Sequence, residues 1–382
     1  MKRRQFVKKI GTGAALAGGA AVSLPLLSGC NDTQSQAPEP AATTTTQTQP
    51  TRRTIEWRMV TTWPKGFPGL GTGAEHLARL VEELTDGQIR VRVFGAGEIA
   101  APFDILDTVS EGTAEMGHGA AYYWQDQLEG ASFFGAVPFG FNGQEMNAWL
   151  YYGGGMELWQ ELYAQRGLVP TAGGNTGVQL GGWFTRRIDS IADIDGLRMR
   201  LPGFAQEVMR RHGGIPTNLP GGELFSALRS GELDATEWVG PYNDVNFGLH
   251  KAAPYMYYPG WQEPGTCIEC FVNAEALNSL SSHLRRAVLY ACRLANYDML
   301  AEFTALNADA LQQIRREPDV EVLAFPDDVM RAFKQTSTEI IAEQADKGEL
   351  TRRIHRSFTE FFDKVSDWHA ISEAAMFDAR RL

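Results

Sequence analysis

The stretches Ile55-Glu56-Trp57-Arg58-Met59-Val60 and Ile89-Arg90-Val91-Arg92-Val93-Phe94 alternate apolar with polar side chains, which is typical of β-strands with one buried face. Between them, residues 74–84 repeat apolar side chains at helical spacing. A helix over 102–111, with a proline in its first turn, and a strand over 114–120 are expected next. This β-α-β-α-β order predicts a mostly parallel sheet with helices on both faces.

A second α/β unit is predicted to begin near Val178. Its expected strands and helices are the strands 179–184, 197–200 and 233–238 and the helices 204–212 and 223–230. The strand expected over 267–273 returns to the first sheet, and the chain from Leu277 on is expected to be almost wholly helical. Two α/β lobes joined by several crossings form a hinged cleft, which is the usual place for a small ligand.

The first 30 residues have the order of an export signal: a basic start, an apolar stretch and an exit of small residues. Arg3 and Arg4, followed by Phe6, resemble the twin-arginine (Tat) address for export of folded proteins. Leu27-Ser28-Gly29-Cys30 resembles a bacterial lipobox, in which the cysteine becomes lipidated. The alternatives are a basic tail before one anchor helix, and a chance cysteine at a cleavage site.

Residues 31–53 consist mostly of Pro, Ala, Thr and Gln, which predicts a flexible tether. Signal, anchor cysteine and tether in this order predict a protein of the periplasm, held by a lipid anchor, and exclude a cytosolic enzyme. Removal of the five Lys and Arg of the signal takes the formal charge from −11 to −16. That charge argues against nucleic acid and anionic lipid as partners, because both need a basic face.

Three cysteines remain after Cys30. Cys267 and Cys270 form a C-x-x-C within a predicted strand, where positions three apart point to opposite faces. There is no second C-x-x-C and no nearby histidine, so the pattern favours structural cysteines over a redox pair or a zinc site. A disulfide between two of these cysteines, Cys292 included, stays open for an exported protein.

Three tracts carry a family resemblance: Gly196-Leu197-Arg198-Met199-Arg200-Leu201-Pro202, Gly213-Gly214-Ile215-Pro216, and Glu223-Leu224-Phe225-Ser226-Ala227-Leu228-Arg229-Ser230-Gly231-Glu232-Leu233-Asp234-Ala235. Together they resemble the DctP-like solute-binding subunits of TRAP (tripartite ATP-independent periplasmic) transporters, and the likeness runs from Ile55 to Leu382. The resemblance implies a two-lobed α/β periplasmic binding protein fold, class II-like, with a long C-terminal helix. It also implies delivery of the solute to TRAP membrane subunits.

Four further tracts resemble the branch of this family that binds 2-oxo or 2-hydroxy monocarboxylates such as pyruvate or lactate. They are Tyr122-Tyr123-Trp124, Gln179-Leu180-Gly181-Gly182-Trp183-Phe184, Glu237-Trp238-Val239-Gly240-Pro241-Tyr242 and Tyr258-Pro259-Gly260-Trp261-Gln262-Glu263-Pro264-Gly265. The branch implies a metal ion, sodium or calcium, beside the ligand, and homodimers joined through the C-terminal helix.

The expected domain limits follow from this resemblance. Lobe I is expected over 54–177 and 268–320, and lobe II over 178–267 and 321–350. A C-terminal dimerisation helix is expected over 351–382, where apolar residues recur at spacings of three and four. Such a stripe packs either on its own body or on a partner, and the resemblance favours a partner.

Arg200 is the first candidate for ligand binding. The resemblance places it on the substrate carboxylate, and a guanidinium offers a fixed fork of donors that matches a carboxylate. Gln179, Glu237, Glu263 and the backbone carbonyl of Trp238 are the expected metal ligands, because hard cations prefer carboxylate, amide and carbonyl oxygens. An ordinary polar role at a strand end is the alternative for each side chain.

The other candidates for the ligand pocket are aromatic or amide side chains: Tyr123, Trp63, Asn175 and Trp183, together with Gln179 and Trp238. Aromatic walls with a few polar groups suit small ligands, and a place in the core of a lobe is the alternative.

An exported Tat-dependent redox or hydrolytic enzyme is the competing function. A hydrolase needs a nucleophile beside a base, yet the chain has no Gly-x-Ser-x-Gly and its histidines form no metal-type pair. Gly69-Leu70-Gly71-Thr72-Gly73 is too short and wrongly spaced for a dinucleotide loop. The sequence therefore predicts a binding protein that is not an enzyme.

Overall fold

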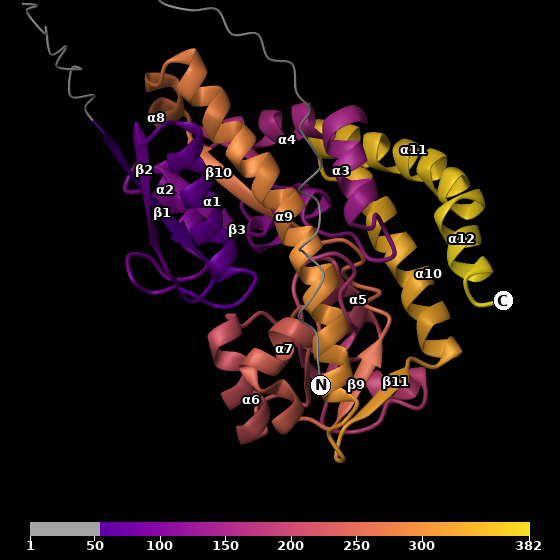
Figure 1. Cartoon of the computed structure of the whole chain (residues 1–382). Coiled ribbons are helices and arrows are strands. Elements are labelled where there is room, and N and C mark those ends of the chain that lie inside the picture. Colours follow the sequence, from indigo (N-terminus) through magenta and orange to yellow (C-terminus); the bar gives the residue numbers. More distant parts are fainter. Residues whose placement is uncertain (1–53) are drawn as a thin grey trace, which may run out of the picture. The chain divides into compact units, whose positions relative to one another are not determined.

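The computed structural model describes residues 54–382 (Figure 1). The predicted signal, residues 1–30, and the predicted tether, residues 31–53, lie outside the described residues. The described part contains two β-sheets with helices packed around them. None of its helices is both long and apolar enough to cross a membrane.

Five strands form the first sheet, in the order β2-β1-β3-β10-β4. Their bounds are β1 Ile55–Thr61, β2 Ile89–Phe94, β3 Met116–Gly119, β4 Leu168–Asn175 and β10 Cys267–Asn273. β1 pairs in parallel with β2 and β3, as predicted. β10, the strand predicted to return to this sheet, lies antiparallel between β3 and β4 and makes the sheet mixed.

The two faces of the first sheet are covered by different helices. α1 (Gly71–Leu84) and α9 (Ser282–Ile314) pack on one face. α2 (Ile105–Ser110) and α4 (Gly155–Ala164) pack on the other face. Consecutive residues of a strand point to opposite faces. Accordingly Cys270 lies in the apolar cluster under α1 and α9, whereas Phe271 lies in the cluster with α2 and α4.

The expected helix over 102–111 is shorter in the structure, where α2 begins at Ile105. The expectation that Pro102 lies in its first turn is wrong. The backbone N–H of Asp104 donates to the Ala101 carbonyl at 3.0 Å, so Pro102 occupies the tight turn that precedes the helix.

Six short strands form the second sheet, in the order β11-β9-β5-β8-β6-β7. Their bounds are β5 Gly182–Phe184, β6 Arg198–Arg200, β7 Ile215–Thr217, β8 Ala235–Thr236, β9 Tyr255–Tyr258 and β11 Glu321–Ala324. The strands expected over 179–184 and 233–238 are therefore only three and two residues long. As a result Gln179, Glu237 and Trp238 lie in the loops beside these strands.

The remaining helices are α3 Gly143–Tyr152, α5 Ala205–Arg211, α6 Leu224–Ser230, α7 Pro241–Phe247, α8 Ala274–Ser279, α10 Asp327–Glu343, α11 Glu349–Ile371 and α12 Glu373–Ala379. Figure 1 shows α9 running from the side of the first sheet to α7, which belongs to the second α/β unit. The expectation of an almost wholly helical chain after Leu277 missed β11, which pairs in parallel with β9.

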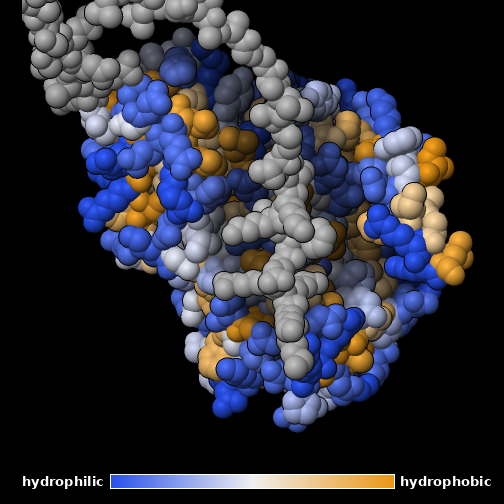
Figure 2. All heavy atoms as spheres, in the orientation of Figure 1, coloured by the Kyte–Doolittle hydropathy of each residue, from blue (hydrophilic) through white to orange (hydrophobic). Residues whose placement is uncertain are grey.

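The single helix expected over 351–382 is two helices in the structure, because the backbone breaks at Ser372 between α11 and α12. The first part of the apolar stripe packs on its own body, where Ile354 and Phe358 are buried. The second part is exposed: Trp368 is 60% and Ile371 75% accessible to solvent. Figure 2 shows apolar atoms at the surface over this end of the chain.

Candidate functional site

Arg200 ends strand β6, and its side chain is only 1% exposed. Its guanidinium is held by three groups from distant parts of the chain. Nε donates to the Leu219 carbonyl at 3.0 Å, and Nη2 donates to the Tyr123 hydroxyl at 3.3 Å. Nη1 donates to the Glu237 carboxylate, with which it forms a buried ion pair. The structure thus brings together three residues that the sequence predicts for one site.

Glu237 follows strand β8 and is 0% exposed. Its backbone N–H donates to the Arg200 carbonyl at 3.1 Å, which fixes the two residues side by side. Burial raises the pKa of Glu237, and the Arg200 guanidinium opposes that rise. A buried carboxylate is costly without a partner, so this pair holds the loop after β8 against β6.

Aromatic rings enclose the guanidinium. Trp238 lies with its ring 5.2 Å from the Arg200 Cζ atom, within the range of a cation–π contact. Trp63 packs edge-on against Trp238 at 6.2 Å between ring centroids, and Tyr123 lies 6.4 Å from Trp63. Trp63 and Tyr123 come from loops after strands β1 and β3, at the carboxyl ends where ligands bind in open α/β sheets.

A buried histidine, which the sequence analysis did not single out, fixes the orientation of Trp63. The indole N–H of Trp63 donates to His118 Nδ1 at 2.8 Å, and His118 Nε2 lies 3.4 Å from the Gly173 carbonyl. Burial lowers the pKa of His118 to about 4. The imidazole is therefore neutral near pH 7, with Nδ1 as acceptor and Nε2–H as donor.

Gln179 and Glu263 lie side by side in two segments that are far apart in the sequence. The backbone N–H of Gln179 donates to the Glu263 carbonyl at 3.1 Å. Burial raises the pKa of Glu263 to about 7, and the negative charge of Glu263 in turn contributes to the raised pKa of Glu237. The two carboxylates therefore repel each other, and the Arg200 guanidinium favours the charged form of both.

Within residues 54–382, three buried side-chain oxygens of this group have no hydrogen-bond partner: Gln179 Oε1, Glu237 Oε2 and Glu263 Oε1. An unpaired buried acceptor costs free energy, and here three come from neighbouring residues. A hard cation such as sodium or calcium takes such oxygens, so the residues present fit one. The free donors here are all oxygens, unlike the thiolate and imidazole ligands of most transition-metal centres.

Comparison with known proteins identifies the family of the chain. Residues 59–347 match the family model of the bacterial extracellular solute-binding proteins, family 7. The chain belongs to this family. The resemblance of the Arg200 motif to TRAP solute-binding subunits is confirmed by this match, and the two-lobed α/β fold class is confirmed by the solved structures described next.

Several relatives of this family 7 protein have known ligands. A monocarboxylate 2-oxoacid-binding periplasmic protein of Nostoc sp. is 38% identical over 87% of this chain and 90% of its own. A TRAP solute-binding protein of Pseudoalteromonas atlantica, solved with sodium and pyruvate, is 40% identical with a TM-score of 0.83, over 85% of this chain and 99% of its own. The Colwellia psychrerythraea protein, solved with calcium and pyruvate, is 39% identical with a TM-score of 0.83, over 86% of this chain and 100% of its own.

A TRAP solute-binding protein of Bordetella bronchiseptica is 34% identical to this family 7 protein, with a TM-score of 0.84, over 86% of this chain and 97% of its own. It was solved as a mixed-occupancy dimer, with calcium and picolinate in one site and the other site empty.

Two predicted pocket residues of the family 7 protein have their polar groups engaged elsewhere. The Trp183 indole N–H donates to Asp244 at 2.8 Å, and the ring is buried in a core cluster. Asn175 Oδ1 accepts from the backbone N–H of Gly177 at 2.8 Å. Within residues 54–382 no hydrogen bond joins either side chain to Arg200. Their direct contact with a ligand therefore stays a prediction.

Three hydroxyl groups beside the candidate metal ligands were missed by sequence reasoning, namely those of Tyr122, Thr176 and Thr266. Thr176 lies three residues before Gln179, and Thr266 lies three residues after Glu263. That spacing was the available signal, but a threonine near a polar residue is too common to single out.

The three described cysteines are free and buried. Burial raises the pKa of the Cys267 thiol, which disfavours the reactive thiolate.

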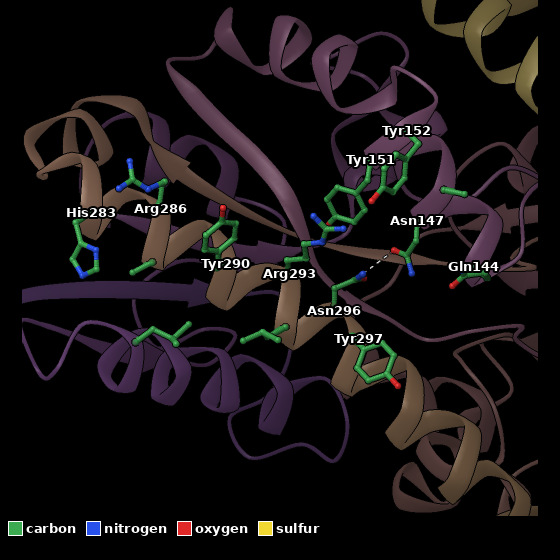
Figure 3. A pocket seen from close by; sticks show the side chains of 14 residues that line it. Gln144, Asn147, Tyr151, Tyr152, His283, Arg286, Tyr290, Arg293, Asn296 and Tyr297 are labelled. Carbon is green, nitrogen blue, oxygen red and sulfur yellow. Dashed lines mark hydrogen bonds between the residues drawn. The ribbon is translucent and has the colours of Figure 1, made fainter.

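A surface hollow of about 790 Å³ lies between α3 and α9 (Figure 3). It is lined by tyrosines and arginines such as Tyr151, Tyr290 and Arg293, and Asn296 donates to Asn147 at 2.7 Å across it. None of the predicted site residues lines this hollow. It is thus separate from the enclosed group around Arg200.

Proposed function

We propose that this solute-binding protein captures a small 2-oxo or 2-hydroxy monocarboxylate, of the pyruvate or lactate kind, together with a sodium or calcium ion. It then delivers the solute to the membrane subunits of a TRAP transporter. The observation that carries the proposal is a buried arginine beside three unpartnered buried oxygens. Such a site supplies positive charge for a carboxylate and acceptors for a cation, which are the two halves of a metal-assisted monocarboxylate site.

Each residue has an assigned part in this proposal. Arg200 binds the carboxylate through its guanidinium, and Tyr123, which already contacts Arg200, donates a hydrogen bond to the ligand. Gln179, Glu237, Glu263 and the Trp238 carbonyl would hold the cation, whose positive charge would offset the two buried carboxylates and favour an oxygen-rich 2-oxo or 2-hydroxy acid. Gln179 and Trp238 also face the ligand. Trp63, Asn175 and Trp183 wall the pocket.

The relatives support this ligand class. Two proteins that are 40% and 39% identical to this chain were solved with pyruvate, one with sodium and one with calcium. The relative from Nostoc sp. is named for 2-oxoacids. Both cations therefore remain candidates for this chain.

Binding without catalysis is the function that the buried group favours. Arg200 and its neighbours include carboxylates, an amide and aromatic rings, and the buried His118 is neutral and accepts a hydrogen bond from Trp63. An exported Tat-dependent redox or hydrolytic enzyme is the alternative. A coloured cofactor in the absorption spectrum of the purified protein, or turnover of a bound acid, would favour it.

The cellular context of the proposal rests on the first 53 residues. We infer export by a twin-arginine-type signal, lipidation of Cys30 and a tether that places the binding body in the periplasm. Mass spectrometry of the protein purified from membranes tests this: an acylated N-terminal cysteine supports it, and an unmodified cleaved terminus contradicts it.

We also infer a homodimer joined through the C-terminal helices. The exposed apolar residues of α11 and α12 support it, because contiguous exposed apolar surface marks interaction sites. For the lobes we retain the limits 54–177 with 268–320 and 178–267 with 321–350. The division of the strands between two sheets supports those limits.

Thermal unfolding of the purified protein with small carboxylates tests the proposed function. A ligand that binds only the folded protein raises the melting temperature by mass action, by the equivalent of about 2.7 kcal/mol at a hundredfold excess over the dissociation constant. We expect a rise with pyruvate or lactate that needs sodium or calcium and disappears in Arg200→Ala. No rise with any monocarboxylate, dicarboxylate or sugar acid, with either cation, overturns the proposal.

A further inference from the structure

Two buried threonine hydroxyls contact the Gln179 side chain, and each donates its single hydrogen to another group. Thr266 Oγ1 donates to Glu263 Oε2 at 2.6 Å, and Thr176 Oγ1 donates to the Gly177 carbonyl at 3.2 Å. A hydroxyl has one hydrogen and two lone pairs. Once its hydrogen is given away, each threonine oxygen can only accept.

Both threonine oxygens accept hydrogen bonds from the side-chain amide of Gln179. Its Nε2 donates to Thr176 Oγ1 at 3.1 Å and to Thr266 Oγ1 at 3.0 Å, which uses both amide hydrogens. The flipped amide would place Gln179 Oε1 against two oxygens that have no hydrogen to offer. With Glu263 ionised, these hydrogen bonds fix the amide orientation, and among residues 54–382 Oε1 is left without a partner.

The Glu263 carboxylate is oriented in the same way. The Tyr122 hydroxyl, at 3.2 Å, and the Thr266 hydroxyl both donate to Oε2. Oε1 is buried and has no partner in the described part of the chain. Each of the two side chains is thus held by one end, and the oxygen at its other end is left as a free acceptor.

The backbone keeps the two segments that carry these residues together. The N–H of Thr176 donates to the Thr266 carbonyl at 3.0 Å, and the N–H of Gln179 donates to the Glu263 carbonyl at 3.1 Å. All five side chains are buried. The hydroxyls are therefore shielded from bulk solvent, and their directions are set by the protein.

We propose that Thr266, together with Thr176 and Tyr122, is a positioning residue that presents Gln179 Oε1 and Glu263 Oε1 to the cation. The inference rests on the proposed function, because it assumes that a cation binds between these oxygens. Groups that orient metal ligands from behind typically contribute 10- to 100-fold to metal affinity. A merely structural role would affect the stability of the protein and leave cation affinity unchanged.

The test compares two substitutions at one position. Thr266→Val keeps the shape and removes the hydroxyl, so Gln179 is free to flip and Glu263 loses its closest donor. Thr266→Ser keeps the hydroxyl. Calcium binding is measured by calorimetry in sodium-free buffer, with and without excess pyruvate. We expect Thr266→Val to weaken calcium binding by at least about tenfold, and Thr266→Ser to stay close to the natural protein.

A matched control separates affinity from stability. Thr85 is buried in the first α/β unit, and its hydroxyl donates to the Val81 carbonyl at 2.7 Å. Thr85→Val should lower the melting temperature and leave the calcium affinity as it is. If Thr266→Val does not fold, Tyr122→Phe removes one donor to Glu263 with the ring retained, and we expect it to weaken calcium binding several-fold.

The outcomes distinguish the two proposals. If the natural protein binds neither cation with or without pyruvate, the proposed function fails and this inference fails with it. If the natural protein binds calcium and Thr266→Val, or Tyr122→Phe in its place, binds it equally tightly, the positioning role is wrong and the proposed function stands.

Discussion

The buried ion pair of Arg200 and Glu237 matters more for stability than an exposed pair on the same strand. Neither side chain reaches water, and each is the nearest opposite charge of the other. Two residues before Arg200 on the same strand, Arg198 pairs with Asp234 at the surface. Exposed pairs of that kind contribute little to stability, whereas breaking a buried pair leaves an uncompensated charge.

We expect Glu237→Gln to lower the free energy of unfolding by about 3 kcal/mol, because it leaves the Arg200 guanidinium buried without its counter-charge. Urea unfolding followed by circular dichroism measures the change. Asp234→Asn, which leaves Arg198 exposed to solvent, is the control and should have a clearly smaller effect. Equal effects of the two substitutions would mean that the buried pair is not held as the structure describes.

A second buried carboxylate gives a prediction about pH. Glu269 on β10 accepts hydrogen bonds from the Trp124 indole and from the Tyr163 hydroxyl at 2.7 Å, and no basic side chain of residues 54–382 donates to it. Burial raises its pKa from 4.5 to about 7. The folded protein therefore keeps this proton at pH values where the unfolded chain has lost it. The stabilisation is complete below pH 4.5 and is lost as the pH rises through 7.

We expect Glu269→Gln to reduce this loss of stability between pH 4.5 and 7 by roughly 3 kcal/mol. Melting temperatures across that range measure it, and the curve of the variant should be flatter than that of the natural protein. A residual slope is expected, because burial also raises the pKa of Asp244 and Glu263 to about 7. Parallel curves for the two proteins would contradict the assignment.

Sequence reasoning went furthest for single residues inside motifs. Arg200, Glu237, Gln179 and Glu263 were predicted, and the structure places them together. The orientation of the Gln179 amide was beyond reach, because it depends on Thr266, which lies 87 residues away in the chain. Local patterns carry no information on which hydroxyl gives its hydrogen to which oxygen.

The short strands of the second sheet could not be predicted from the local pattern of apolar and polar residues. The expected strand 179–184 is ordered as a strand only over Gly182–Phe184, because the chain before it forms the loop that carries Gln179 to Glu263. β11 has exposed and half-buried residues in no regular alternation, so only its pairing with β9 makes it a strand. Short strands at a binding site are set by tertiary contacts more than by local pattern.

The short turn before α6 provides a prediction for an element. Gly221 begins the 3₁₀ turn Gly221–Glu223, and its Cα lies against the ring of Trp238, the indole that packs over Arg200. A side chain at Gly221 would overlap that ring. At the next position, Gly222, an added methyl group would meet nothing within 4 Å.

We therefore expect Gly221→Ala to displace Trp238 and to weaken ligand binding by about tenfold, the cost of modest overpacking. Gly222→Ala is the neighbouring control and should bind as the natural protein does. Calorimetry with the ligand found in the thermal screen measures both. Equal affinities would show that the Trp238 ring can shift without consequence for the ligand, and its place in the pocket would then be wrong.

At the scale of the molecule, the site draws residues from both sheets. Tyr123 follows strand β3 of the first sheet, and Arg200 ends strand β6 of the second. Their contact at 3.3 Å therefore joins the two α/β units beside the Arg200 guanidinium. The sequence predicted this arrangement, because carboxyl ends of strands in two lobes face a common cleft. A ligand that binds both residues should favour the arrangement in which the units are together.

The C-terminal end of the chain makes the last prediction. Its apolar stripe has two fates in the structure: Phe358 is buried in the core of its own chain, whereas Ile371 and Phe377 remain 75% and 55% exposed. Exposed apolar surface of this kind is costly in water and is stabilised by a partner. A stable interface also needs on the order of 1,000 Å² or more, so α11 and α12 would have to contribute together.

We expect Ile371→Asp combined with Phe377→Asp to convert a dimer into a monomer in sedimentation equilibrium, because a charge buried in an apolar interface is strongly unfavourable. Ile99→Asp, at a 39% exposed apolar residue in a loop of the first α/β unit, is the control and should leave the dimer intact. Ligand affinity should be unchanged in all three proteins, since the Arg200 group is built within one chain. A natural protein that is monomeric at micromolar concentration would overturn the dimer. A dimer that survives the double substitution would place its interface elsewhere, and the aromatic hollow between α3 and α9 would be the next surface to substitute.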